Sequence, residues 1–306
     1  MKKRLLFTSL VAFSLLFTGC ADDTSDDKDD KTTNNQPNSP FTPNNQPNNN
    51  QPNNQNTGGE ITCAQVVPLG NEEICLIDSY GNAQDDAAVR NIFNEIKNFY
   101  APDFPAEFYL YAESQGINAF YTQLGPNEDY IFFGGNFFYT YKNKFPNTYL
   151  TAITGVMAHE FGHNIQYNTY VDESQFSSQR QVLNVGQTVV LQELEADAFS
   201  GLYMYFKFQS EAEFDTYFQT IYELGDDGYT NPGHHGTPEQ RQAAAAFGFL
   251  VADEIIKNNL QNTLSYADIR IFFVSSIMQE LLFEYNFRDA KKQFNLKLFM
   301  GTVKCS

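Results

Sequence analysis

The stretch that decides the fold is TAITGVMAHEFGHNIQY, residues 151–167. We predict a helix over these residues, in which positions four apart lie on the same face. His159 and His163 have this spacing, so their imidazole rings converge on one point beside the helix. The chain has only 4 histidines, and two of them stand here. This helix is therefore predicted to carry the chemistry of the domain.

His159, Glu160 and His163 form the pattern His-Glu-x-x-His. Two converging imidazoles suit a tetrahedral zinc ion, and the carboxylate between them can take a proton from a water molecule at the metal. In a chain with this histidine usage the pattern arises by chance with a probability of roughly 0.3–1%. We therefore predict Zn²⁺ as the cofactor, His159 and His163 as its ligands, and Glu160 as the general base.

A second helix, predicted over residues 188–208, carries the sequence Glu193-Leu-Glu195-Ala-Asp197. Two histidines leave zinc one protein ligand short of a catalytic His₂Glu set. Glu193 and Asp197 are one turn apart and share a face, whereas Glu195 points roughly to the other side. Acidic residues are also common on exposed helices of an acidic chain. The spacing alone therefore leaves Glu193, Glu195 and the 164–192 connection open as sources of the third ligand.

A third block, residues 237–240 (Thr-Pro-Glu-Gln), is a capping box with proline at the first helical position. It predicts the start of a helix that runs to residue 257. His234 and His235 stand just before it, and one of them could donate a hydrogen bond to an oxyanion at the metal. Tyr229 and Arg241 are alternatives, and Arg241 could instead pair with a helix carboxylate.

These three blocks, in this order, resemble the neutral zinc metallopeptidase family of bacteria over roughly residues 80–250. The resemblance, which extends to the gluzincin pattern, implies that Glu193 is the third zinc ligand and that Asp197 orients a ligand histidine. The family's His-Gly-Thr pattern favours His235 as the residue that stabilises the oxyanion. Glu195 departs from the family, which tends to have Gln there. The resemblance does not extend beyond about residue 258.

The sequence pattern of the rest of the domain predicts strands followed by helices, which indicates an α+β fold. The resemblance implies a zincin-like domain, with a small aromatic-rich β-sheet, an active-site helix and a mainly helical C-terminal half. We predict a helix over 85–100, capped by Asp85 or Asp86, and strands over 107–112, 119–123 and 130–141, the last broken at Gly134-Gly135. The aromatic segment 130–133 is expected to offer a sheet edge to an extended peptide.

The N-terminus reads as a targeting segment. The chain begins with Lys2, Lys3 and Arg4 and continues with an apolar run that is too short for a membrane span. Cys20 follows this run, and the whole segment resembles a bacterial lipoprotein signal. We expect residues 1–19 to be the signal peptide and Cys20 to carry a lipid that anchors the protein to a membrane of the cell envelope. The alternative is an ordinary secretory signal with a chance cysteine.

Residues 20–59 are acidic and then rich in Asn, Gln and Pro, so we predict a disordered tether and place the metallopeptidase domain at 60–306. An exported domain can hold disulfides. Cys63 and Cys75 bracket a turn at residues 68–71 and could pair, although either could instead pair with Cys305.

Composition narrows the function classes. The 306 residues carry a net charge of −18, which disfavours nucleic acid as a partner. The resemblance to the metallopeptidase family implies a peptidase that acts on a protein or peptide substrate. The main rival is a binding module on an inactive zincin scaffold, but such a module would have no need of Glu160. A structural zinc site would usually show four protein ligands including cysteine.

Overall fold

The computed structural model describes residues 63–69, 72–100, 104–113, 118–125, 128–169, 185–226, 234–261 and 263–282. The chain divides between Gly58 and Gly59 into two units, and every described residue belongs to the second unit. The expected signal peptide and tether, Cys20 and Cys305 lie outside the described residues. Within the described part of the chain, no helix has the length and apolar character needed to cross a bilayer.

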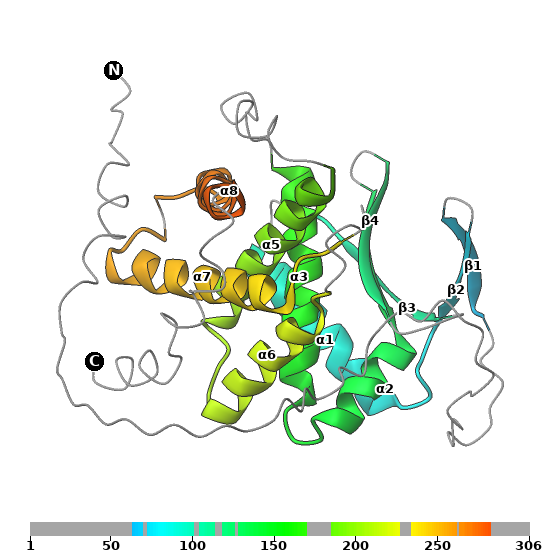
Figure 1. Ribbon diagram of the computed structural model, residues 1–306. Helices are drawn as coiled ribbons and strands as arrows, with labels where there is room; N and C mark the ends of the chain where they lie inside the picture. Colours follow the sequence, from blue (N-terminus) through cyan, green and yellow to red (C-terminus); the bar gives the residue numbers. More distant parts are fainter. Residues whose placement is uncertain are drawn as a thin grey trace, which may run out of the picture. The chain divides into compact units, whose positions relative to one another are not determined.

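A sheet of five strands forms one side of the domain (Figure 1). The strands are β1 (Gln65–Leu69), β2 (Glu72–Ile77), β3 (Glu107–Ala112), β4 (Ala119–Gly125) and β5 (Glu128–Gly134), in the spatial order β1-β2-β3-β5-β4. β3 and β5 are parallel, and the other pairs are antiparallel. The expectation that residues 130–133 form a sheet edge is wrong, because β5 is paired on both sides. The edge strands are β4 and β1.

A disulfide closes the β1–β2 hairpin. It joins Cys63, just before β1, to Cys75 in β2, and the two strands pair antiparallel. β1 lies at the far edge of the sheet, where Pro68 needs no ladder partner for its missing N–H.

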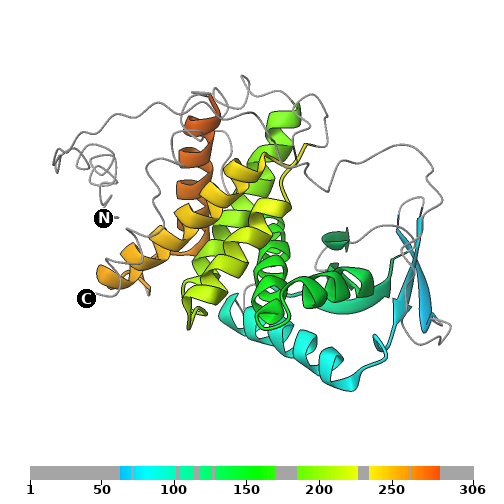
Figure 2. The same ribbon diagram turned by 60° about the horizontal axis from the view of Figure 1, so that its bottom comes forward.

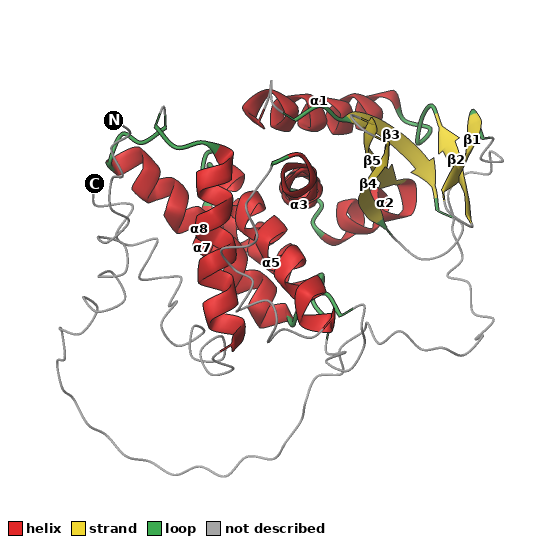
Figure 3. Ribbon diagram, turned by 90° about the horizontal axis from the view of Figure 1, so that it is seen from above, coloured by secondary structure: helices red, strands yellow, loops and turns green. Residues whose placement is uncertain are grey.

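Seven helices are described, and α3 (Tyr149–Asn168) lies at the centre of the domain. Figure 3 shows it between the sheet with α1 (Ala83–Tyr100) and α2 (Gly135–Lys144) on one side and the later helices on the other. Those later helices are α5 (Val185–Met204), α6 (Glu211–Glu223), α7 (Pro238–Lys257) and α8 (Tyr266–Leu282). The predicted α+β fold with a mainly helical C-terminal half is confirmed, as is the break after Gly134, where β5 ends and α2 begins.

The start of α1 differs from the prediction. The Asn82 side chain caps the helix, because its Oδ1 accepts the backbone N–H groups of Gln84 (2.9 Å) and Asp85 (3.2 Å). Asp85 and Asp86 were expected as caps, and that expectation is wrong: both lie in the first turn. Asp85 is buried and receives two hydrogen bonds from Lys142 of α2, at 2.7 and 2.8 Å.

Close helix contacts at glycines fix the spacing of α3, α5 and α7. A Cβ on Gly162 of α3 would lie 2.7 Å from the Cα of Ala196 on α5. A Cβ on Gly248 of α7 would lie only 1.7 Å from the carbonyl oxygen of Ala198 on α5. Since such distances exclude any side chain, the three backbones can approach closely only because these positions are glycine. Figure 2 shows α7 crossing α5.

Candidate metal centre

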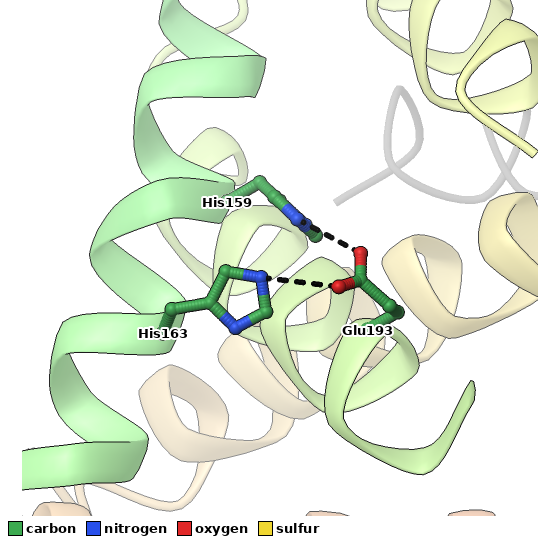
Figure 4. A group of neighbouring side chains, drawn as sticks. All are labelled: His159, His163 and Glu193. Carbon is green, nitrogen blue, oxygen red and sulfur yellow. Dashed lines mark ion pairs between the residues drawn. The ribbon is translucent and has the colours of Figure 1, made fainter. Parts of the chain in front are cut away.

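The candidate site is built from two neighbouring helices, α3 and α5. His159 and His163 project from the same face of α3, as their spacing predicts, and Glu193 faces them from α5 (Figure 4). Their ligand atoms all lie within 4.8 Å of one another. Within the described residues this is the group of His, Cys, Asp and Glu side chains that could hold a metal ion.

The distances in this group fit a tetrahedral metal site. The Nε2 atom of His159 lies 3.4 Å from Oε2 of Glu193, and Nε2 of His163 lies 3.5 Å from Oε1 of Glu193. Zinc bonds of about 2.0–2.1 Å at tetrahedral angles separate two ligand atoms by about 3.3–3.4 Å. Each imidazole therefore already stands at the distance from a carboxylate oxygen of Glu193 that a shared zinc ion requires.

A carboxylate and an arginine support the first histidine. The Nδ1–H of His159 donates to Oδ1 of Asp197 (2.8 Å), and Asp197 is fully buried. Arg241 of α7 donates to both oxygens of Asp197, from Nε (2.8 Å) and Nη2 (2.9 Å). With Nδ1 donating to Asp197, Nε2 is the nitrogen that faces Glu193, and it becomes a metal ligand when a metal displaces its proton. Asp197 thus stands where the family pattern implies.

An amide supports the second histidine, and this contact was missed at the sequence level. The Nδ1–H of His163 donates to Oε1 of Gln166, at 2.8 Å. Gln166 follows His163 by three positions on the same helix, so helical spacing was the signal that could have found it. With this partner His163 also carries its proton on Nδ1 and presents the Nε2 lone pair to the site.

Glu160 is anchored to the sheet. Its Oε2 accepts the backbone N–H of Tyr121 on β4, at 2.8 Å. The side chain is buried, and this burial raises the pKa of Glu160 above its usual value, although the nearby imidazoles of His159 and His163 oppose the shift. A raised pKa makes the carboxylate a better proton acceptor.

The other pKa shifts follow from burial opposed by close partners. Burial and Arg241 lower the pKa of His159, but the carboxylates of Asp197 and Glu193 together outweigh them, and the pKa is raised to about 9. Burial raises the pKa of Glu193, but the imidazoles of His159 and His163 outweigh it and hold the pKa well below its usual value. Glu193 is therefore a carboxylate at neutral pH, which is the form that binds a metal.

Residues near the start of α7 surround Asp226. His234 is buried and its Nδ1 pairs with Oδ1 of Asp226 at 2.5 Å. The backbone N–H of His235 donates to Oδ2 of Asp226 (2.9 Å), and the side chain of His235 is 54% exposed. Arg241 is buried, and its Nη1 lies 3.5 Å from Oε2 of Glu193. Tyr229, the remaining alternative for the oxyanion, lies outside the described residues.

Glu195 is directed away from the ligand set. Its Oε1 accepts from Nε of Arg270 on α8 (2.7 Å), and its Oε2 accepts from Nε2 of Gln166 (3.1 Å). Burial raises the pKa of Glu195 to about 7, although Arg270 and Gln166 oppose the shift. The structure thus brings Glu193, and not Glu195, to the two histidines. No sequence signal singles out Arg270.

The structure thus places the His-Glu-x-x-His helix of an α+β domain against a glutamate from a second helix, which is a donor set suited to zinc. Comparison with protein families agrees: residues 112–254 match the model of the family described as Putative neutral zinc metallopeptidase. The resemblance to this family is therefore confirmed over that range, which contains all three sequence blocks. No curated protein and no solved structure matches the chain.

Proposed function

We propose that the chain is a zinc-dependent peptidase that hydrolyses peptide bonds in protein or peptide substrates with a metal-activated water. One observation carries the proposal. Both imidazoles direct Nδ1 to an acceptor, so their Nε2 atoms face Glu193, 3.4 and 3.5 Å from its carboxylate oxygens. This donor set, two imidazoles and one carboxylate, is the His₂Glu set of catalytic zinc sites, which leave one metal position open.

The protein groups have separate roles in the reaction. His159, His163 and Glu193 would hold the metal, and a bound zinc ion supplies a Lewis acid that lowers the pKa of a water from about 16 towards 7. Glu160 accepts the proton of the attacking water and then passes it to the leaving amine. The backbone N–H of Tyr121 fixes one oxygen of Glu160 during both transfers, which keeps the carboxylate aimed at the site.

The oxyanion that develops on the scissile carbonyl needs a hydrogen-bond donor, and we assign this role to His235. Of the candidates near the start of α7, His235 has an exposed ring that a substrate can reach. His234 is buried against Asp226. Arg241 is buried and its Nε and Nη2 donate to Asp197, so it serves the ligand His159 rather than a substrate.

The outer edge of β4 is the proposed place for the substrate backbone. Gly134 of β5 donates to the carbonyl of Asn118, so the backbone groups of Ala119, Tyr121 and Gln123 alternate to the opposite, outward side. Tyr121 N–H indeed points outward, to Glu160. An extended peptide that adds to this edge pairs with the other outward groups, because Glu160 occupies the N–H of Tyr121, and it runs past the general base.

The proposal includes a location. A basic start, a short apolar run and Cys20 support a lipoprotein signal, so we propose a lipid anchor on Cys20 that holds the enzyme at the bacterial cell envelope. The rival function is a binding module with an inactive site. The presence of both histidines together with Glu160 speaks against it, because binding alone needs no general base.

Hydrolysis of denatured casein by the purified protein tests the proposal. We expect cleavage that a chelator abolishes and added zinc restores. The matched control is Glu160→Gln, which keeps the shape of the side chain but cannot accept a proton. We expect it to retain about one zinc per chain and to lose activity by about 10²–10⁴-fold. A wild-type protein that binds zinc yet is no faster than Glu160→Gln would instead support the binding module.

A further inference from the structure

A chain of buried hydrogen bonds leads from the second histidine to α8. Gln166, whose Oε1 accepts from His163, uses its Nε2 to donate to the carbonyl of Gln192 (2.7 Å) and to Oε2 of Glu195 (3.1 Å). The other oxygen of Glu195 accepts from Nε of Arg270 (2.7 Å). Arg270 belongs to α8, which lies beyond the 112–254 range of the family match.

The polar groups of this chain are shielded from water. The exposed fractions are 8% for Gln166, 2% for Glu195 and 9% for Arg270. A buried carboxylate is costly unless an opposite charge and hydrogen bonds compensate it, and Arg270 is the cation that contacts Glu195. Arg270 is itself held at a second point, because its Nη1 donates to the carbonyl of Thr169 just after α3 (2.7 Å). It therefore ties α8 to both helices of the metal site.

The direction of these hydrogen bonds determines which ring nitrogen of His163 carries the proton. An amide has two different ends, and the acceptors at Gln192 and Glu195 both require the NH₂ end of Gln166. The oxygen end must then face His163, which places the imidazole proton on Nδ1 and the lone pair on Nε2. Were the amide reversed, its NH₂ group would face Nδ1, the proton would move to Nε2, and His163 could not bind a metal.

We propose that Arg270 on α8 is a positioning residue for the metal ligand His163, acting through Glu195 and Gln166. This inference rests on the proposed function of the site. Each ligand histidine is then supported by a buried arginine from a later helix. His159 reaches Arg241 of α7 through Asp197, and His163 reaches Arg270 of α8 through the longer path.

Zinc affinity of Arg270→Gln, measured at pH 8 by competition with a chromogenic chelator, tests the proposal. We expect a loss of about 10–100-fold, the range for outer partners of a metal ligand. The matched control is Arg90→Gln, which also removes an arginine. Arg90 is exposed, and within the described residues its one hydrogen bond goes to the carbonyl of Asp78. The zinc affinity of Arg90→Gln should stay within about twofold of wild type. The visible spectrum of the Co²⁺-loaded protein should change in Arg270→Gln alone.

Exchanging the side chains of Gln166 and Glu195 tests whether this path positions His163 or only stabilises the fold. This test remains available if Arg270→Gln does not fold. Glu195→Gln alone should weaken zinc binding, because its amide can reverse and only the carbonyl of Gln192 then still fixes the direction of Gln166. The double variant Gln166→Glu/Glu195→Gln places a carboxylate directly behind His163, keeps the net charge and leaves an acceptor for Arg270. We expect it to restore the affinity and the Co²⁺ spectrum in part, because the carboxylate at position 166 offers no donor to the carbonyl of Gln192.

The outcomes are distinguishable. If the wild-type protein binds no zinc, the proposed function fails and the inference with it. If the wild type binds zinc, and both Arg270→Gln and Glu195→Gln bind it with unchanged affinity and spectrum, the positioning role of Arg270 is overturned while the proposed function stands.

Discussion

The spacing of α3 and α5 at Gly162 should control metal binding. Gly162 lies between the two ligand histidines in sequence, and the Cβ of an alanine there would lie 2.7 Å from the Cα and 2.8 Å from the carbonyl oxygen of Ala196. Ordinary contact begins at 3.4 Å, so the two helices must separate locally by about 0.7 Å in Gly162→Ala. Because α5 carries Glu193, this shift moves the carboxylate away from the histidines.

The expected changes in folding stability and in zinc affinity can be estimated for Gly162→Ala. Alanine is favoured over glycine in a helix by about 1 kcal/mol, whereas overpacking costs about 1–3 kcal/mol. The net loss of folding stability is therefore about 0–2 kcal/mol. Metal sites tolerate displacements of only about 0.2 Å, so a shift of about 0.7 Å should weaken zinc binding by at least about tenfold. Zinc affinity should thus fall much more than the melting temperature.

Gly135→Ala is the matched control for this experiment. Gly135 begins α2, and the added Cβ would lie 3.2 Å from the ring of Tyr80, which can yield slightly. Zinc affinity would be measured by chelator competition and stability by thermal unfolding of the metal-free proteins. We expect Gly135→Ala to bind zinc like wild type. Unchanged zinc affinity in Gly162→Ala would refute the argument that helix spacing sets the ligand geometry.

Three further variants test other parts of the account. Asp197→Asn should weaken zinc binding by about 10–100-fold, since an amide can reverse and misorient His159. An affinity equal to wild type in a chelator titration would show that Asp197 does not orient His159. His235→Ala should lower kcat by about 10²–10³-fold at unchanged zinc content, and a wild-type kcat would show that another group stabilises the oxyanion. Cys20→Ala should move the protein from the membrane pellet to the soluble fraction, and continued pelleting after a high-salt wash would contradict the lipid anchor.

Features with local signals were predictable from the sequence. The α3 helix follows from its composition and histidine spacing, and the start of α7 follows from a capping box that the structure contains, with Thr237 and Gln240 each accepting the other's backbone N–H. Strand β3 also has the expected bounds, and the break at Gly134 is where two conformationally flexible glycines follow an aromatic run. In each case neighbouring residues supply the physical cause.

Features that depend on distant residues were not predictable. Hairpin β1–β2 has short strands, one with a proline, and is held by pairing and a disulfide rather than by local preference. The edge position of β4 depends on the order of strands, to which aromatic content gives no guide. Asn82, not the aspartates, caps α1 because the helix begins earlier than its apolar pattern. The contact of Arg270 with Glu195 spans 75 positions, and no local pattern encodes it.

The amount of zinc bound by Glu193→Gln, compared with that bound by wild type and Glu160→Gln, tests the central claim most directly. The account predicts about one zinc per chain for wild type and for Glu160→Gln, because Glu160 is a base and not a ligand. It predicts markedly weaker binding for Glu193→Gln, which loses a negatively charged ligand atom set between two imidazoles. Zinc held as tightly by Glu193→Gln as by Glu160→Gln would contradict the account.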